Sequence, residues 1–384
     1  MKVEKSKLQT IGKITFWLAM IIEITLVIVE KSSLIIPYEG QIFRLTFVLF
    51  LCKILTTRYS KKEWLVIFFA FLFTGIVYLI NTRDEVVRMV ALIAACKDVE
   101  LKKLMKVTFV LTLAGSLVLM ILSICGIGEV AIAADYGREA VEKRYTFGMG
   151  HPNGFHCMFY MLILMAMYVY DEKWNWMPYA GLLILNYIVY RFTVSNTGFI
   201  VTSIVLVAGI VFHYWKKCKD YKVIYFLSVS GLMLAVLLSM AGAAYGRDIP
   251  GLEWLDFYLN GRMNSAFVVE DARIWNWTLF GKPENIEYFD EAYIRLFYWY
   301  GIIPTIAYLL ANVYLIYQSY RKKDYIMLII VVSLALYNIM EAHIISQYLM
   351  RNILFVLMGY YWTVPFEQEK EQLYLWGWIP IRKG

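Results

Sequence analysis

The chain has 384 residues, of which 60% are hydrophobic and 17% aromatic, and its formal net charge is +7. Charged residues make up only 17%, too few to cover a water-soluble globular surface of this size. Apolar windows of roughly 17 to 20 residues recur along the chain, each long enough to cross a hydrocarbon core of about 30 Å. We therefore expect an all-α, polytopic integral membrane protein.

The apolar windows predict about twelve transmembrane helices in a single transmembrane domain, residues 1–384. In chain order they are 13–29, 43–57, 63–80, 85–97, 107–126, 152–170, 177–190, 197–215, 223–241, 292–317, 325–341 and 350–364. The windows 85–97 and 177–190 are short, so either is a tilted half-span, a re-entrant element or a full crossing.

Lysines occur in every second connection between these windows. They are Lys61, Lys62, Lys102, Lys103, Lys106, Lys216, Lys217, Lys219, Lys322 and Lys323, together with those of the amino terminus. The positive-inside rule places these connections and both termini in the cytoplasm. The first window contains Glu23 and lacks a small-residue cleavage site, so we expect a retained span and not a secretory signal.

Arginines predominate on the opposite, outer side. They are Arg44, Arg83, Arg88, Arg138, Arg144, Arg191, Arg247, Arg262, Arg273, Arg295 and Arg351, against Lys31, Lys143 and Lys282. The planar guanidinium binds phosphate and carboxylate through two hydrogen bonds, so this surface suggests an anionic ligand. Snorkelling at the membrane interface explains a single arginine equally well, and we favour the ligand for those in long loops.

Two outer connections are long, near 127–151 and 242–291, and long loops on a compact frame usually carry function. Residues 366–384 form a short amphipathic tail that we place in the cytoplasm. The cysteines and histidines show no metal-ligand spacing, and there is no nucleotide-binding motif. We expect no metal, no cofactor and no nucleic-acid partner.

The stretch RYTFGMGHPNGFH, Arg144–His156, leads from the first long loop into the sixth window. Pro152 suits the first turn of a helix, so the stretch predicts a helix amino terminus that faces outward. With Arg144 nearby, its free N–H groups can bind a phosphate or pyrophosphate. The alternative is an ordinary helix start that His151 and Asn153 cap.

Two further stretches carry candidate residues. In YRFTVSNTGF, residues 190–199, Ser195 or Asn196 can cap a helix, whereas Arg191 has no such local role. The second long loop contains Arg262 and Arg273 and ends in YFDEAYIRLFYWYG, residues 288–301.

In this last segment Asp290 suits an N-cap and Glu291 can pair with Arg295, although either carboxylate can also serve as a base. Tyr293 can stack on a sugar ring or belong to an interface belt of aromatic residues. Within the membrane windows Glu23 and Lys53 are expected to pair, and Glu341 lies near the outer end of its window, where it can line a cavity.

These residues resemble the Wzy-type polysaccharide polymerases, within the superfamily that includes the O-antigen ligases. The matches are Arg144–Asn153, Ser195–Phe199, Gly261 and Arg262, Gly281, Asp290–Tyr293, and Tyr300 with Gly301. The resemblance implies a multi-pass protein of the bacterial cytoplasmic membrane. It also implies a metal-independent, inverting glycosyltransferase that polymerises undecaprenyl-pyrophosphate-linked repeat units on the outer face of that membrane.

By the same resemblance Arg144 and Arg262 hold the pyrophosphate. The family commonly has an arginine where this chain has Asn196, and Arg191 is a candidate to supply that charge. The implied partners are the lipid-linked donor and acceptor, membrane lipid, a chain-length regulator and a flippase.

Glycosyl transfer to a hydroxyl needs a base, and the outer candidates are His151, Asp290 and Glu341, with His151 ranked first for its pKa. The substrate-binding candidates are Arg144, Asn153, Arg191, Arg262, Arg273 and Tyr293. A ligase that moves finished glycan to another acceptor is the nearest alternative. A flippase for lipid-linked oligosaccharide would instead show related halves and buried charge along a path, and neither is evident.

Overall fold

The computed structural model describes residues 2–32, 34–134, 142–259, 261–342, 345–368 and 372–375. Within these residues seven helices are long and apolar enough to cross a membrane. They are α1 (Lys2–Glu30), α3 (Lys61–Asn81), α5 (Leu101–Ile124), α6 (Pro152–Tyr170), α8 (Asn196–Tyr214), α9 (Lys222–Tyr245) and α13 (Ile302–Lys322). The expected all-α membrane protein is confirmed, while the count of twelve spans stays a prediction.

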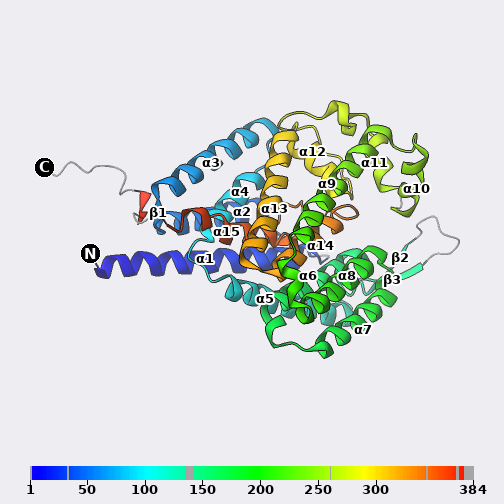
Figure 1. The fold of residues 1–384 in the computed structure, drawn as a ribbon, viewed down its shortest axis with the longest axis horizontal. Coiled ribbons are helices and arrows are strands. Elements are labelled where there is room, and N and C mark those ends of the chain that lie inside the picture. The colour runs from blue at the N-terminus through cyan, green and yellow to red at the C-terminus, as the bar shows by residue number, and fades with distance from the viewer. Residues whose placement is uncertain are drawn as a thin grey trace.

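Shorter elements complete the fold (Figure 1). The remaining helices are α2 (Glu39–Leu55), α4 (Glu85–Ala95), α7 (Trp176–Thr193), α10 (Pro250–Tyr258), α11 (Arg262–Val268), α12 (Ala292–Tyr300), α14 (Tyr325–Tyr337) and α15 (Leu354–Tyr361). Single 3-10 turns are η1 (Asp171–Lys173), η2 (Lys216–Asp220), η3 (Glu270–Ala272), η4 (Ile274–Asn276), η5 (Leu349–Arg351) and η6 (Val364–Phe366). At 1.5 Å per residue α4 is about 16 Å long, too short to cross a bilayer by itself.

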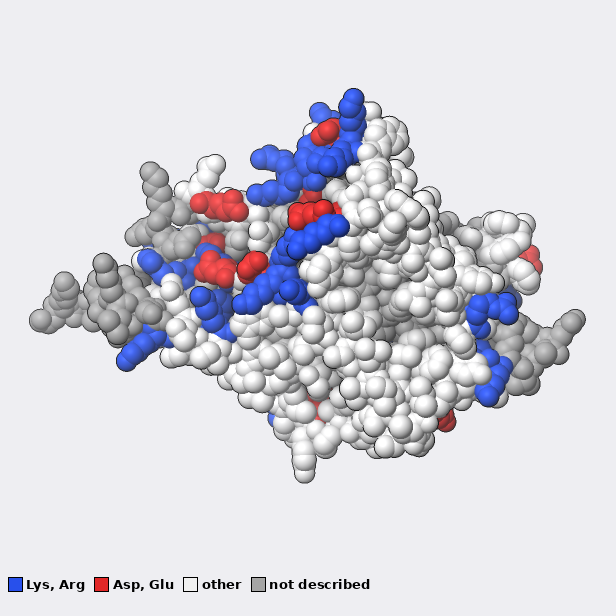
Figure 2. Space-filling view, turned by 90° about the horizontal axis from the view of Figure 1, so that it is seen from below, with Lys and Arg blue, Asp and Glu red and all other residues white. Residues whose placement is uncertain are grey.

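The helices form a buried centre and an outer layer with many exposed apolar side chains. Most residues of α6, α14 and α15 are buried, whereas only 28% of the most apolar window is buried in each of α3, α5 and α9. Leu79 is 80% exposed, Phe226 68% and Ile121 60%. So many large apolar side chains on the surface are expected when lipid, not water, surrounds the helices. Figure 2 shows the resulting broad face without charge, bordered by lysines, arginines and acidic residues.

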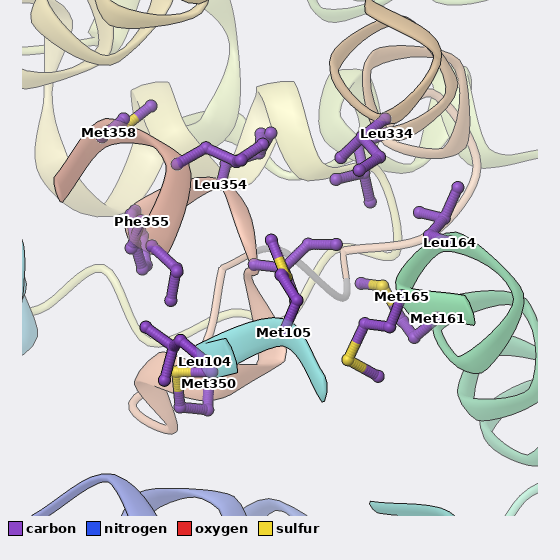
Figure 3. Packing of buried hydrophobic residues seen from close by; sticks show 14 of the residues in the cluster. Leu104, Met105, Met161, Leu164, Met165, Leu334, Met350, Leu354, Phe355 and Met358 are labelled. Carbon is purple, nitrogen blue, oxygen red and sulfur yellow. The ribbon is translucent and has the colours of Figure 1, made fainter. Parts of the chain in front are cut away.

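The core is rich in methionine where four helices converge (Figure 3). Met105 of α5 lies between Leu354 of α15 and Met165 of α6, and Leu334 of α14 closes the cluster. The unbranched methionine side chain adapts to the irregular gaps left by helices that meet at different angles.

The two kinds of connection lie at opposite ends of the molecule. Lys102 pairs with Glu172 at 2.8 Å, Lys323 pairs with Asp220 at 3.2 Å, and Tyr325 donates to Asp171, so these four connections share one end. The other end, here called the loop end, carries β2 (Ala131–Ala134), β3 (Glu142–Tyr145), α10 and α11, at the right of Figure 1. The side of the membrane that each end faces stays a prediction.

The described residues of both long connections contain regular secondary structure. Strands β2 and β3 pair antiparallel, with Ile132 opposite Arg144, and the second connection contains α10, α11, η3 and η4. Directly before Lys61 and Lys62, β1 (Tyr59–Ser60) pairs with β4 (Gln372–Leu373). This pairing holds the described part of the expected tail against the chain before α3. Residues 369–371 and 376–384 of that tail lie outside the described residues.

The predicted span 292–317 is wrong, because the helix breaks at Gly301 into α12 and α13. Gly301 has a φ of 87°, and a Cβ there would lie 2.3 Å from the backbone nitrogen of Gly281. Only glycine permits this backbone geometry and this approach of two chain segments. The break directs α12 towards the loop end while α13 crosses the fold.

The predicted pair between Glu23 and Lys53 is also wrong. Glu23 of α1 lies 3.5 Å from Arg88 of α4 and accepts a hydrogen bond of 2.6 Å from Thr46 of α2. The Arg88 guanidinium covers the ring of Phe43 at 3.8 Å. This sealed pair joins three helices, so Arg88 belongs to the helix core and not to an outer surface.

Candidate functional site

Helix α6 begins at Pro152, as its sequence predicts. His151 is the N-cap residue, with extended backbone, and its Nδ1 accepts a hydrogen bond of 3.2 Å from the Asn153 N–H. Gly148, with a φ of 81°, packs so closely on α5 that a Cβ would lie 2.7 Å from the Leu119 carbonyl. The glycines therefore hold the amino end of α6 against α5 at the loop end.

Arg144 of β3 connects this helix start to the end of α7. Its Nε donates to the Thr193 carbonyl at 2.6 Å, and its Nη2 donates to the Val194 carbonyl at 3.2 Å and to Asn153 Oδ1 at 2.8 Å. The carbonyls at a helix carboxyl end are natural acceptors for a cation. Arg144 is buried and its charge faces neutral oxygens in these three bonds.

Asn153 connects Arg144 to two segments that are distant in the sequence. Its Nδ2 donates to Glu341 Oε1 at 2.8 Å, and Arg262 Nη2 donates to the same oxygen at 3.0 Å. Arg262 Nε lies 3.4 Å from Asp290 Oδ2. Arg144, Asn153, Glu341, Arg262 and Asp290 thus form one chain of contacts, here called the Arg262 network. Five residues proposed from sequence are brought together from the stretch that opens α6, from the second long connection and from the segment after α14.

The network is open at one side and closed at the other. The side chain of Asp290 is 51% exposed, that of Arg262 14% and that of Glu341 9%. Burial raises the pKa of Glu341 above the usual value of a carboxyl group, although the nearby Arg262 opposes this. Glu341 is therefore a stronger proton acceptor, once ionised, than an exposed glutamate would be.

His151 is less suited to be a base than its sequence position suggests. Burial and the neighbouring Arg144 lower its pKa, so the imidazole is neutral at neutral pH. Because Nδ1 accepts the Asn153 N–H, the neutral ring carries its proton on Nε2, which is then a donor. In this geometry Nδ1 of His151 caps the helix, which makes His151 a weaker candidate for the base than Glu341.

Three substrate-binding candidates lie apart from the Arg262 network. Arg191 is exposed on α7, and Arg273 donates to the Phe267 carbonyl at 2.8 Å. Tyr293 is buried, with its hydroxyl donating to the Ala335 carbonyl at 2.9 Å, so its ring packs in the core. None of the contacts found for these three side chains reaches the network.

Several local interpretations of the capping residues are corrected. The N-cap of α12 is Glu291 and not Asp290, and neither Glu291 nor Ser195 makes a side-chain capping bond. Arg295 does not pair with Glu291, because its guanidinium donates to the Phe289 carbonyl at 2.9 Å and covers the ring of Tyr288 at 3.3 Å. Asp290 is thereby left to face Arg262.

A second charged group beside the network was missed by sequence reasoning. Arg351 Nη2 lies 2.7 Å from Glu30 Oε1, and Lys31 Nζ lies 3.6 Å from Glu30 Oε2. Lys31 runs past the first turn of α6 at Gly154, and burial lowers its pKa to about 8. The sequence signal for this group was Lys31, a lysine on the side where arginine predominates.

The described residues contain no group of three or more His, Cys, Asp or Glu side chains placed to hold a metal ion. No protein-family model matches the chain, and neither curated proteins nor solved structures give a match. The fold and the site together define an all-α membrane protein with a partly buried arginine–carboxylate network at one end of its helices.

Proposed function

We propose that this protein is a polysaccharide polymerase: an inverting glycosyltransferase that joins lipid-pyrophosphate-linked oligosaccharide repeat units on the outer face of a bacterial cytoplasmic membrane. The observation that carries the proposal is the Arg262 network. It unites Arg144 and Arg262, the two arginines that the family resemblance assigns to pyrophosphate, with a buried carboxylate and an exposed one.

Electrostatics supports an anionic ligand at the network. Arg262 is held by two carboxylates, Glu341 and Asp290, and a pyrophosphate carries more charge and more acceptor oxygens than either of them. Donor binding at Arg262 would therefore displace a carboxylate. The displaced group becomes available to accept a proton only when the donor is in place.

In the proposed reaction an acceptor sugar hydroxyl attacks the anomeric carbon of the donor from the face opposite the pyrophosphate. The new C–O bond forms as the bond to the pyrophosphate oxygen breaks, and that oxygen leaves with the electron pair, stabilised by Arg262 and Arg144. Glu341, freed from Arg262, takes the hydroxyl proton and returns it to solvent. Inversion at carbon follows from the single displacement.

The predicted topology agrees with this chemistry. Twelve spans with cytoplasmic termini would place the loop end, and with it the network, outside the membrane, where flipped lipid-linked units are found. The donor and acceptor lipids would reach the network from the bilayer. A flippase and a chain-length regulator are the expected functional partners.

The test is the size distribution of surface glycan in cells that lack the protein. Complementation uses wild type, Arg262→Gln, and the control Lys282→Gln, which removes the same charge from an exposed position of the same connection. We expect single repeats in the deletion strain, and long chains with wild type and Lys282→Gln only. Long chains that persist on carrier lipid would identify a ligase instead, and repeats trapped inside the cell would identify a flippase.

A further inference from the structure

An apolar groove runs between α5, α6 and α7 and encloses about 680 Å³. Its lining contains no charged residue and follows α6 from Phe155 to Tyr170. At 1.5 Å per residue this is a length of about 22 Å, most of the thickness of a hydrocarbon core. Figure 2 looks at the molecule from the side on which α5 and α7 lie in Figure 1, and it shows a broad uncharged area with charged residues at its borders. The groove therefore has the length and polarity of a lipid chain.

One end of the groove lies beside the Arg262 network. Met149 and Phe155 line it, and they stand on either side of His151 and Asn153 in the chain. Val189 also lines it, one helical turn before Thr193, whose carbonyl binds Arg144. A molecule with an anionic head at Arg144 can thus place an apolar chain directly into the groove.

A second groove, between α3, α4, α13 and α15, encloses about 510 Å³ and lacks this charge complementarity. Near its loop end Arg83 lies 4.0 Å from Glu85, and the Arg83 guanidinium covers the ring of Trp299 at 4.1 Å. Tyr300 also donates to Glu85 at 3.0 Å. The arginine found there is covered by a tryptophan ring, whereas the first groove ends beside two arginines, Arg144 and Arg262.

We infer that the groove between α5, α6 and α7 holds the isoprenoid chain of the lipid whose phosphate groups bind the Arg262 network. This inference rests on the proposed function and adds where the donor lipid lies. Transfer from bilayer to groove removes no apolar surface from water, so the gain comes from packing alone. The groove is therefore expected to select chain length and shape, with effects of about tenfold.

Gly181 of α7 offers a direct test, because it lines the groove and a Cβ built there meets no atom within 4 Å. A Gly181→Trp side chain therefore starts from open space and is expected to occupy part of the groove. Gly231 of α9 is the matched control, since a Cβ there also meets nothing within 4 Å and the residue does not line this groove.

The experiment measures glycosyl transfer in proteoliposomes with two donors that carry the same oligosaccharide pyrophosphate, one on undecaprenol and one on the much shorter geraniol. Gly181→Trp is expected to raise KM about tenfold for the undecaprenyl donor and to leave the geranyl donor unchanged. Gly231→Trp should change neither. The geranyl reaction also reports whether each variant is folded.

Unchanged use of the undecaprenyl donor by Gly181→Trp, or an equal loss with both donors, overturns the inference while the proposed function stands. If wild type transfers neither donor, the proposed function fails. The groove is then judged by photo-crosslinking with diazirine-labelled undecaprenyl phosphate. Labelling of α6 and α7 that Gly181→Trp abolishes supports the groove, and labelling that excess phospholipid removes equally well overturns it.

Discussion

Two arginine–carboxylate clusters in this protein use the same chemistry in opposite settings. Arg88 and Glu23 lie on helices α4 and α1 with side chains 4% and 0% exposed, and Arg88 also lies 3.7 Å from Asp84 on its own helix turn. Arg262 and Asp290 come from the long second connection, with side chains 14% and 51% exposed. The first pair cannot exchange partners without opening the helix core, whereas the second can be reached by a ligand.

The difference suggests how to separate structural from functional charge in a membrane protein. Burying charged side chains inside a helix bundle costs free energy. A pair whose two residues both lie on packed helices is therefore held in a single arrangement. A pair that lies on connecting segments and is open to solvent on one side can exchange its carboxylate for a phosphate group of a ligand. The predictions below test this division, beginning with the largest effect.

The largest expected effect is that of Arg262→Gln on glycosyl transfer. Loss of one positioned charge that stabilises a leaving group costs about 10²- to 10³-fold in rate. Initial rates in proteoliposomes measure it, and they are expressed per folded molecule, with the folded fraction taken from thermal unfolding. Lys282→Gln serves as the control, and a variant that keeps half of the wild-type rate would remove Arg262 from the site.

Glu341→Gln should lower kcat about 100-fold, because an amide cannot accept the proton of the acceptor hydroxyl. The KM for donor should stay the same or fall, since Arg262 is then released from a competing carboxylate. Steady-state kinetics with varied donor separates the two parameters. A raised donor KM with unchanged kcat would instead make Glu341 a binding residue.

Arg88→Met should act on stability and not on chemistry. It leaves Glu23 buried without its cation, which costs about 3 kcal/mol, while the rate per folded molecule stays unchanged. Denaturant unfolding in detergent measures the loss. The double variant Glu23→Leu with Arg88→Met should recover most of it, because it removes both buried charges. Lower kcat in a stable Arg88→Met protein would contradict the division.

The smallest expected effect is a shift in pH dependence. Glu341 accepts a proton only when ionised, and its pKa is raised by burial and by Asp290, so activity is lost as pH falls through that raised pKa. Asp290→Asn removes one raising charge and should move this acid limb to lower pH by about half a unit. A pH–rate profile tests the shift, and a limb that moves upward would exclude Glu341 as the base.

The sequence predicted most of what local chemistry controls. The start of α6 at Pro152 and the participation of Arg144 and Asn153 follow from one continuous stretch, and Arg262 follows from the resemblance together with the bias of arginine towards one side. Glu341 was identified from its depth within its window. These residues come together because the topology of the chain places their segments at the same end of the molecule.

The remainder depends on contacts between distant segments. The break at Gly301 arises from the approach of Gly281, which no helical pattern reveals. Tyr293 points into the core because of how α12 rotates against α14, and Glu23 selects Arg88 because α4 packs beside α2. Apolarity on all sides of a membrane helix removes the periodic signal that would show which face is buried.

The most direct test of the account is transfer by the purified protein in proteoliposomes that contain only lipid-pyrophosphate-linked oligosaccharide. We predict a ladder of lengthened lipid-linked chains, one released lipid pyrophosphate for each new bond, and inverted anomeric configuration. Arg262→Gln should give no ladder and Lys282→Gln a normal one. A folded wild-type protein that binds the lipid but forms no glycosidic bond would contradict the account.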